Sequence, residues 1–171
     1  MLGAEEPRDG PMPDIKTLYD EDFVVWSHEQ AEGLRSVARE GSNQRLDWKN
    51  LAEEVESLGI SEKRELRSQI QRIIRHLLKL EFSPATLSRE GWIDSVDDGR
   101  TRAELTLESS PSLKGVVDEI VAKEMRRAAR KAMRDLRERG ELNAALTTHI
   151  QATTYIPDQI LGDWFPPEPQ G

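Results

Sequence analysis

The chain has 171 residues, the size of one ordinary domain and enough to bury a core. Hydrophobic residues make up 36% and charged residues 33%, which a helical bundle tolerates because each helix needs only one apolar stripe. The net charge of -8 argues against coating nucleic acid or an anionic membrane by charge alone, and the lack of cysteine excludes disulfides, thiolate nucleophiles and cysteine-based metal sites.

The two ends of the chain differ in composition from the rest. Residues 1–16 form an acidic segment rich in Pro and Gly, without the apolar core of a secretory signal, and we expect a flexible lead-in there. Residues 17–166 should form a single helical domain, and residues 167–171 a disordered tail. Because no apolar run approaches the length of a membrane span, we expect a cytoplasmic protein.

The first expected helix covers residues 18–40, where apolar residues recur on one face before Gly41 stops the helix. A short second helix should begin at Asp47 and end at Gly59. Ser61 then caps a third helix that ends near Phe82. The tight connection favours an antiparallel hairpin of the second and third helices. The third helix is the most apolar, so we expect it at the centre, with these residues most deeply buried: Leu66, Ile70, Ile73 and Leu77.

A fourth helix is expected from near Trp92 through Leu107, although Gly99 weakens it. Ser110-Pro111 is typical of a helix start and predicts a fifth helix over residues 111–139. The tail should hold one short turn of helix at residues 157–161, followed by two aromatic residues that dock on the bundle, Trp164 and Phe165. No strand-like alternation occurs, so the sequence predicts an all-α bundle of about five main helices with no sheet.

Four segments of these helices also carry a resemblance to a known family. They read Leu18-Tyr19-x-x-Asp22-Phe23-x-x-Trp26, then residues 46–59 (LDWKNLAEEVESLG), then His76-Leu77-Leu78-Lys79 and Ser110-Pro111-Ser112-Leu113. In order and spacing they resemble the bacterial family called domain of unknown function 29, over roughly residues 18–166. The resemblance implies a helical fold and no established activity.

Two places depart from the family's pattern. Met125 stands where members tend to carry an aromatic residue in the fifth helix. Members also tend to have a Cys-Pro-aromatic step before the last helical turn, where this chain reads Thr153-Thr154-Tyr155-Ile156. Any role that belongs to that cysteine cannot apply here.

The sequence lacks the patterns of several common sites. A di-iron bundle needs glutamate three residues before histidine, but the residues three before His28, His76 and His149 are Val25, Ile73 and Leu146. Zinc-protease, phosphate-loop and nucleophile-elbow motifs are also missing. We therefore predict no metal and no cofactor, and lean away from an enzyme.

A polar row follows the apolar stripe of the short second helix, one residue behind it, at the edge of the expected core. In the predicted hairpin, His76 would approach this row. The candidate pocket residues are Tyr19, Asp22, Asp47, Asn50, Glu54 and His76. Such a pocket would suit a polar ligand, a metal ion or acid–base chemistry.

A structural role for the same residues is the alternative. Asp47 would then be a helix cap that Asn50 completes, and Glu54 would only orient His76 across the hairpin. Helix register places His76 nearer Asp47 or Asn50 than Glu54. A carboxylate partner would raise the pKa of His76.

The second half of the fifth helix is basic. Residues 123–139 hold eight basic and three acidic residues, a local charge of +5 that leaves -13 elsewhere in a chain of net charge -8. Such asymmetry suits an anionic partner, and the candidates are Arg126, Arg130 and Arg134. The alternative is that cations simply favour a helix C-terminus. No aromatic residues interleave with the arginines, so nucleic acid is disfavoured.

Three functions remain open on the sequence alone. The first is a non-enzymatic cytoplasmic helical module that binds a protein partner or self-associates. The second is an enzyme, or a ligand or metal binder, that uses the polar pocket between the second and third helices. The third is anionic-partner or nucleic-acid binding by the basic helix. An exposed apolar patch would favour the first.

Overall fold

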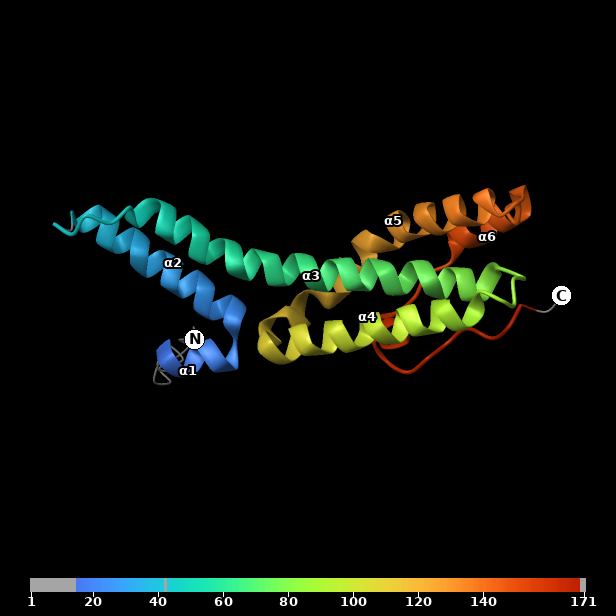
Figure 1. The fold of residues 1–171 in the computed structure, drawn as a ribbon, viewed down its shortest axis with the longest axis horizontal. Helices are drawn as coiled ribbons and strands as arrows, with labels where there is room; N and C mark the ends of the chain where they lie inside the picture. The colour runs from blue at the N-terminus through green and yellow to red at the C-terminus, as the bar shows by residue number, and fades with distance from the viewer. Residues whose placement is uncertain (1–14, 42, 170–171) are drawn as a thin grey trace, which may run out of the picture.

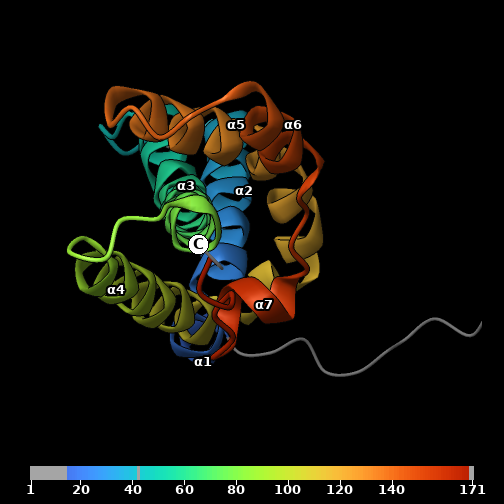
Figure 2. The ribbon, with the colours of Figure 1, turned by 90° about the vertical axis from the view of Figure 1, so that its right-hand side faces the viewer.

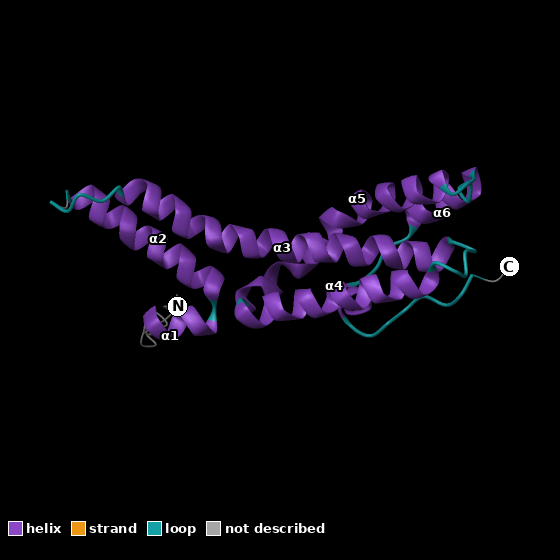
Figure 3. Ribbon diagram, viewed as in Figure 1, coloured by secondary structure: helices purple, strands orange, loops and turns teal. Residues whose placement is uncertain are grey.

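A computed structural model describes residues 15–41 and 43–169, and all regular structure in this part of the chain is helical (Figures 1 and 3). The predicted all-α class is therefore confirmed. Residues 1–14 of the expected lead-in, and residues 170 and 171 of the expected tail, lie outside the described residues. The elements in chain order are α1 (Ile15–Glu21), α2 (Phe23–Glu40), α3 (Trp48–Phe82), α4 (Arg89–Ser109), the 3-10 helix η1 (Pro111–Val116), α5 (Val117–Glu138), α6 (Ala144–Ala152) and α7 (Pro157–Leu161).

The helix expected over residues 18–40 is wrong in one respect, because the chain bends at Asp22 and forms two helices. Asp22 has an extended backbone (φ -155°, ψ 96°), and its carboxylate accepts a hydrogen bond from the Val25 N–H at 3.0 Å. This N-cap satisfies a backbone donor that has no partner inside the first turn of α2. Asp22 therefore starts α2 instead of continuing α1.

The predicted hairpin of the second and third helices is also wrong, because residues 48–82 form one continuous helix of 35 residues. At 1.5 Å per residue, α3 is about 52 Å long. Gly59 does not stop it, since a glycine inside a helix costs only about 1 kcal/mol. Gly59 instead lies where α2 crosses α3, and a side chain there would collide with Ser27 Oγ.

The length of α3 divides the molecule into two parts (Figure 1). We call α2 together with residues 48–62 of α3 the arm. We call the remainder of α3 together with α4 to α7 the bundle. Only two residues of the arm part of α3 are buried, Ala52 and Gly59. In the view of Figure 2, other helices lie on several sides of the bundle part of α3, which contacts α4, α5, α6 and α7.

The core lies in the bundle. Leu66, Ile70, Ile73 and Leu77 are fully buried there, so the predicted centre of the core is confirmed. Gly99 does not end α4. It lets α4 lie close to α3, because a Cβ at this position would be only 2.8 Å from Ile73 Cγ1.

The C-terminal part differs from expectation in its details. The expected helix over residues 111–139 begins as η1 and becomes α5 only at Val117. Helix α6 was not predicted, although Asn143 caps it by accepting a hydrogen bond from the Leu146 N–H at 2.8 Å. The predicted turn at residues 157–161 is present as α7.

Buried Arg100 on α4 holds the end of the chain against the bundle. Its guanidinium donates to the carbonyl oxygens of Ile160 (3.0 Å), Gln159 (3.0 Å) and Trp164 (2.6 Å). It also lies 4.7 Å from the centre of the Phe165 ring. Both aromatic residues pack against the core, as the sequence predicts.

Candidate functional site

The structure separates the residues of the predicted polar pocket. Glu54 and His76 lie on the same helix, 22 positions apart, which corresponds to about 33 Å along α3. The predicted meeting of these two residues is therefore wrong. Because the expected second and third helices are one helix, no space exists between them for a pocket.

Asp47 and Asn50 have the capping arrangement that was the structural alternative. The Asp47 carboxylate accepts hydrogen bonds from the Asn50 N–H (3.2 Å) and from the Asn50 side-chain amide (2.6 Å). These bonds are those of a helix N-cap, which accounts for both residues without a ligand. Both residues are exposed, as is Glu54, so this end of α3 is solvated.

Asp22 joins distant parts of the chain. Besides capping α2, its carboxylate accepts hydrogen bonds from the Ser112 N–H (2.6 Å) and the Ser112 hydroxyl (3.0 Å). Tyr19 does not join it: its ring, which is 51% exposed, contacts Phe23 and Trp26 edge-on. The Asp22–Ser112 contact fixes the base of the arm on η1.

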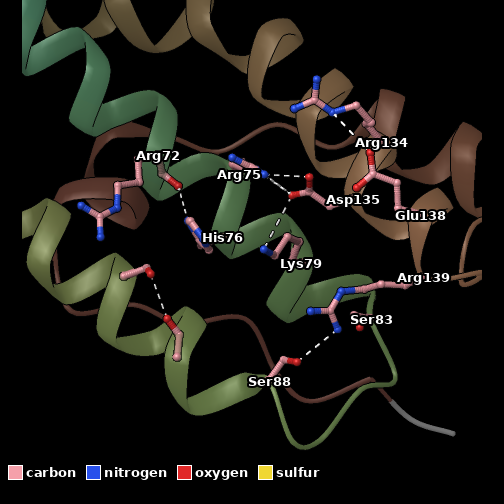
Figure 4. Close-up of polar contacts among 12 residues, drawn as sticks. Arg72, Arg75, His76, Lys79, Ser83, Ser88, Arg134, Asp135, Glu138 and Arg139 are labelled. Atoms are coloured by element: carbon pink, nitrogen blue, oxygen red, sulfur yellow. Dashed lines mark hydrogen bonds and ion pairs between the residues drawn. The ribbon is translucent and has the colours of Figure 1, made fainter.

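His76 lies in a cationic neighbourhood on α3 (Figure 4). Its Nδ1 is 2.9 Å from the Arg72 carbonyl oxygen, so Nδ1 carries the proton and donates. Burial, together with the charges of Lys79, Arg75 and Arg72, lowers the pKa of His76 to about 4, although the hydrogen bond to the Arg72 carbonyl raises it. The pKa increase expected from a carboxylate partner is therefore wrong, and His76 is neutral at pH 7.

Two carboxylates of α5 are neutralised by cations of α3. Asp135 accepts two hydrogen bonds of 2.7 Å from Arg75 and lies 3.7 Å from Lys79 (Figure 4). Glu124 is fully buried, and residues of both helices surround its carboxylate: Gln71, Arg67 and Arg127. These groups join α3 to α5 and leave neither carboxylate free to act as a general base.

The three arginines predicted to bind an anionic partner are all exposed, but they differ in their surroundings. Arg134 lies 4.0 Å from Glu138. Neither Arg126 nor Arg130 forms an ion pair with any residue that the structure describes. Both line a cavity of about 830 Å³ between α5 and residues 150–157. We call this cavity the groove. The sequence did not reveal it, because its second wall includes the end of the unpredicted α6.

The arm has a polar flank. Arg35 on α2 donates to Glu56 on α3 at 2.6 Å, and His28 lies 3.8 Å from the same carboxylate. Counted at about 100° per residue from Ser27, which faces α3, both His28 and Arg35 lie to one side of the contact.

The other flank of the arm is apolar. Leu51 and Leu58 precede Ala52 and Gly59 by one residue, so they lie about 100° round α3 from the face that α2 covers. They are 40% and 46% exposed. The same flank of the arm carries half-buried apolar residues from both helices: Phe23, Trp26, Leu34, Val37 and Val55. The sequence predicted a buried stripe here, but the fold leaves it half covered.

Two general features bear on function. Among the residues that the structure describes, His, Asp and Glu side chains nowhere gather in threes as metal ligands would. No helix in the described ranges combines the length and apolar character needed to cross a bilayer.

Comparison with known proteins relates the chain to a family, and to a helical protein, whose functions are unknown. No curated protein matches it. It is similar to an alpha-helical protein of unknown function from Rhodospirillum rubrum, known from a crystal structure at 1.45 Å resolution. The two are 27% identical with a TM-score of 0.66, over 85% of this chain and 89% of that one. Residues 18–165 match the family described as domain of unknown function DUF29. The chain therefore belongs to the DUF29 family.

Proposed function

We propose that the protein is a non-enzymatic module of the cytoplasm whose arm binds an amphipathic helix of another polypeptide. The observation that carries this proposal is the apolar flank of the arm. Two helices alone leave Leu51 and Leu58 nearly half exposed, and a third helix would cover them. Contiguous apolar surface of this kind marks protein interaction sites.

The charges beside the apolar flank indicate the chemistry of the partner helix. Glu54 and Glu62 lie on α3 within about 60° of Leu51 and form no ion pair among the described residues. A partner helix with lysine or arginine beside its apolar stripe would complement them. Helix-in-groove recognition of this type places apolar anchors at spacings of three, four and seven residues.

A site-specific photocrosslinking amino acid at position 58, in the full chain expressed in its host, tests the proposal. We expect one discrete adduct, and we expect Leu51→Ser to reduce its yield at least tenfold. The matched control is a crosslinker at Leu105, which is 59% exposed on α4 and lies outside the arm. Mass spectrometry of the adduct identifies the partner, and an adduct of two copies would make the partner a second copy of this chain.

Charge reversal provides a second readout. Glu54→Lys combined with Glu62→Lys should weaken the crosslink at position 58 and leave the melting temperature nearly unchanged. Equal crosslinking at positions 58 and 105, or no adduct at either, would refute the proposal.

A further inference from the structure

The groove along α5 has an apolar floor that can adapt in shape. Met125, Ala129 and Met133 follow one another at four-residue steps on the face of α5 that lines it. Methionine side chains are flexible and polarisable, so they fit ligands of variable shape. Ala122 and Ala129 are small, which leaves space above the helix.

The wall opposite α5 is held in place from behind. Tyr155 is buried, and its hydroxyl donates to Glu81 Oε2 on α3 at 2.5 Å. Burial, with the neighbouring carboxylate, raises the pKa of Tyr155, so the hydroxyl keeps the proton that it donates. The wall is therefore fixed before any ligand arrives, as in most small-molecule sites.

Positive charge is concentrated at one place in the groove. Arg126 and Arg130 are one helical turn apart and both line it, and no carboxylate of the described residues forms an ion pair with either. Arginine binds a carboxylate through two parallel hydrogen bonds. Asp118 is the only other charged residue of the lining, and it lies at the far end of the groove.

The distances along α5 suit an acyl chain. The lining on α5 runs from Asp118 to Met133, so the two arginines lie within the groove and its longer free stretch is on the Asp118 side. From midway between Arg126 and Arg130 to Asp118 this stretch covers about ten residues, or about 15 Å of helix. An acyl chain spans about 15 Å, half of the ~30 Å hydrocarbon core of a bilayer. The part of the groove next to the two arginines therefore matches the length of such a chain.

We propose that this groove binds a free long-chain carboxylate, with the carboxylate on Arg126 and Arg130 and the acyl chain on the part of the floor that leads through Met125 and Ala122 to Asp118. A long-chain carboxylate has one negative charge and a long apolar chain, which matches one pair of arginines beside an uncharged stretch of the groove. An acidic helix would need cations spaced along its whole length, and the groove offers them at one level only. This inference is independent of the function proposed for the arm.

Methionine-methyl NMR of the full chain locates the ligand directly. The chain has four methionines: Met1 and Met12, and the two that line the groove, Met125 and Met133. Titration with sodium dodecanoate below its micellar concentration should shift the Met125 methyl signal strongly and the Met133 signal less, because Met133 lies on the side of Arg130 away from Asp118. Assignment uses Met125→Leu and Met133→Leu.

Matched double variants distinguish binding in the groove from general attraction of an anion to the positive charge of α5. Arg126→Gln with Arg130→Gln should weaken dodecanoate binding at least tenfold. The control double variant, Arg134→Gln with Arg137→Gln, removes the same charge from the same helix outside the groove and should bind like wild type. Ala122→Trp fills the groove from an exposed position on its α5 floor, so it should block binding without unfolding the protein.

Two further ligands test whether the carboxylate is required and whether the acyl chain belongs to a free acid or to a membrane lipid. Dodecanol, which lacks the carboxylate, should bind at least tenfold more weakly than dodecanoate. Vesicles containing phosphatidylglycerol should not bind. Four results would overturn the proposal: equal binding by wild type and the Arg126/Arg130 double variant, equal binding of dodecanol, binding to vesicles without binding of dodecanoate, or binding of a glutamate-rich helical peptide in place of dodecanoate.

Discussion

The two parts of α3 show how one helix can carry the same sequence pattern with opposite results. In the bundle, apolar residues from Leu66 to Leu80 are almost completely excluded from solvent. In the arm, Leu51 and Leu58 have helical spacing of the same kind but are nearly half exposed. The difference is the number of neighbouring helices, since the bundle part of α3 contacts four and the arm part mainly α2. Apolar periodicity indicates that a face will be covered, but not which chain covers it.

The sharpest test of this comparison introduces the same charge into each of the two parts of α3. Ile73→Asp would bury an unpaired carboxylate in the core and should abolish folding. Leu58→Asp should leave a folded protein with its unfolding free energy changed by about 0.5 kcal/mol. Circular dichroism melts of the two variants check this, and a cooperative melt of Ile73→Asp would show that the bundle does not depend on this face.

The second test removes the residue that holds the C-terminal segment on the bundle. Arg100→Met keeps the apolar stem but leaves three carbonyl oxygens without their donor, so we expect a loss of about 3 kcal/mol in the free energy of unfolding. Amide hydrogen exchange should accelerate over residues 157–165 and stay unchanged in the arm. Arg102→Met, on the exposed face of the same helix, is the control and should have no effect.

The third test compares the two helix crossings. Gly99→Ala should cost about 1–3 kcal/mol, because the new Cβ meets the side chain of fully buried Ile73. At Gly59 the new Cβ collides with the Ser27 hydroxyl, which rotation about one bond can move aside, and lies 3.4 Å from both Ser27 Cβ and the Val24 carbonyl oxygen. Alanine favours the helix by about 1 kcal/mol at either position, so the net loss should be smaller at Gly59. Adding Ser27→Ala should remove it. Urea denaturation measures both, and a larger loss at Gly59 would mean that the arm is packed as tightly as the bundle.

The smallest expected effect is on pH dependence. The pKa of His76 is lowered to about 4 in the folded protein and is about 6.5 in the unfolded chain, so the unfolded state binds the proton more tightly. Its neutral form therefore contributes stability that is fully present above pH 6.5 and is lost as pH falls through 4. His76→Gln should reduce the loss of stability between pH 6.5 and 4 by about 1 kcal/mol, after allowance for the solvated part of the ring. Identical pH profiles for the two proteins would contradict this assignment.

Sequence patterns predicted the bundle well for physical reasons. The centre of α3 has an uninterrupted apolar stripe, and Pro84 and Pro111 mark helix boundaries that tertiary contacts do not override. The break at Gly59 was wrong because glycine permits a close helix crossing as readily as a helix end. The available signal was the series of small residues that face one another at this crossing: Ser27, Ala31, Ala52 and Gly59.

The candidate sites were harder to predict than the fold. The polar row at Asp47 and Asn50 was assigned to a pocket because a cap and a ligand site use the same residue types. The pair Arg126 and Arg130 was identified by charge, but nothing local to α5 indicates the wall that residues 150–157 supply. A groove between segments about 25 positions apart in the sequence depends on tertiary packing, which periodicity does not describe.

The bond between Asp22 and Ser112 closes a loop, because the two residues are 90 positions apart. Loop closure of that length costs more chain entropy than pairing sequence neighbours such as α2 with α3 or α3 with α4, so this contact should form late in folding. A late contact affects mainly the rate of unfolding. Asp22→Ser keeps a residue that caps α2 but is too short to reach Ser112. In stopped-flow experiments the Asp22→Ser variant should unfold several-fold faster than wild type and refold at nearly the wild-type rate. The Asp22 carboxylate then sets the lifetime of the folded state, because it holds the base of the arm on η1.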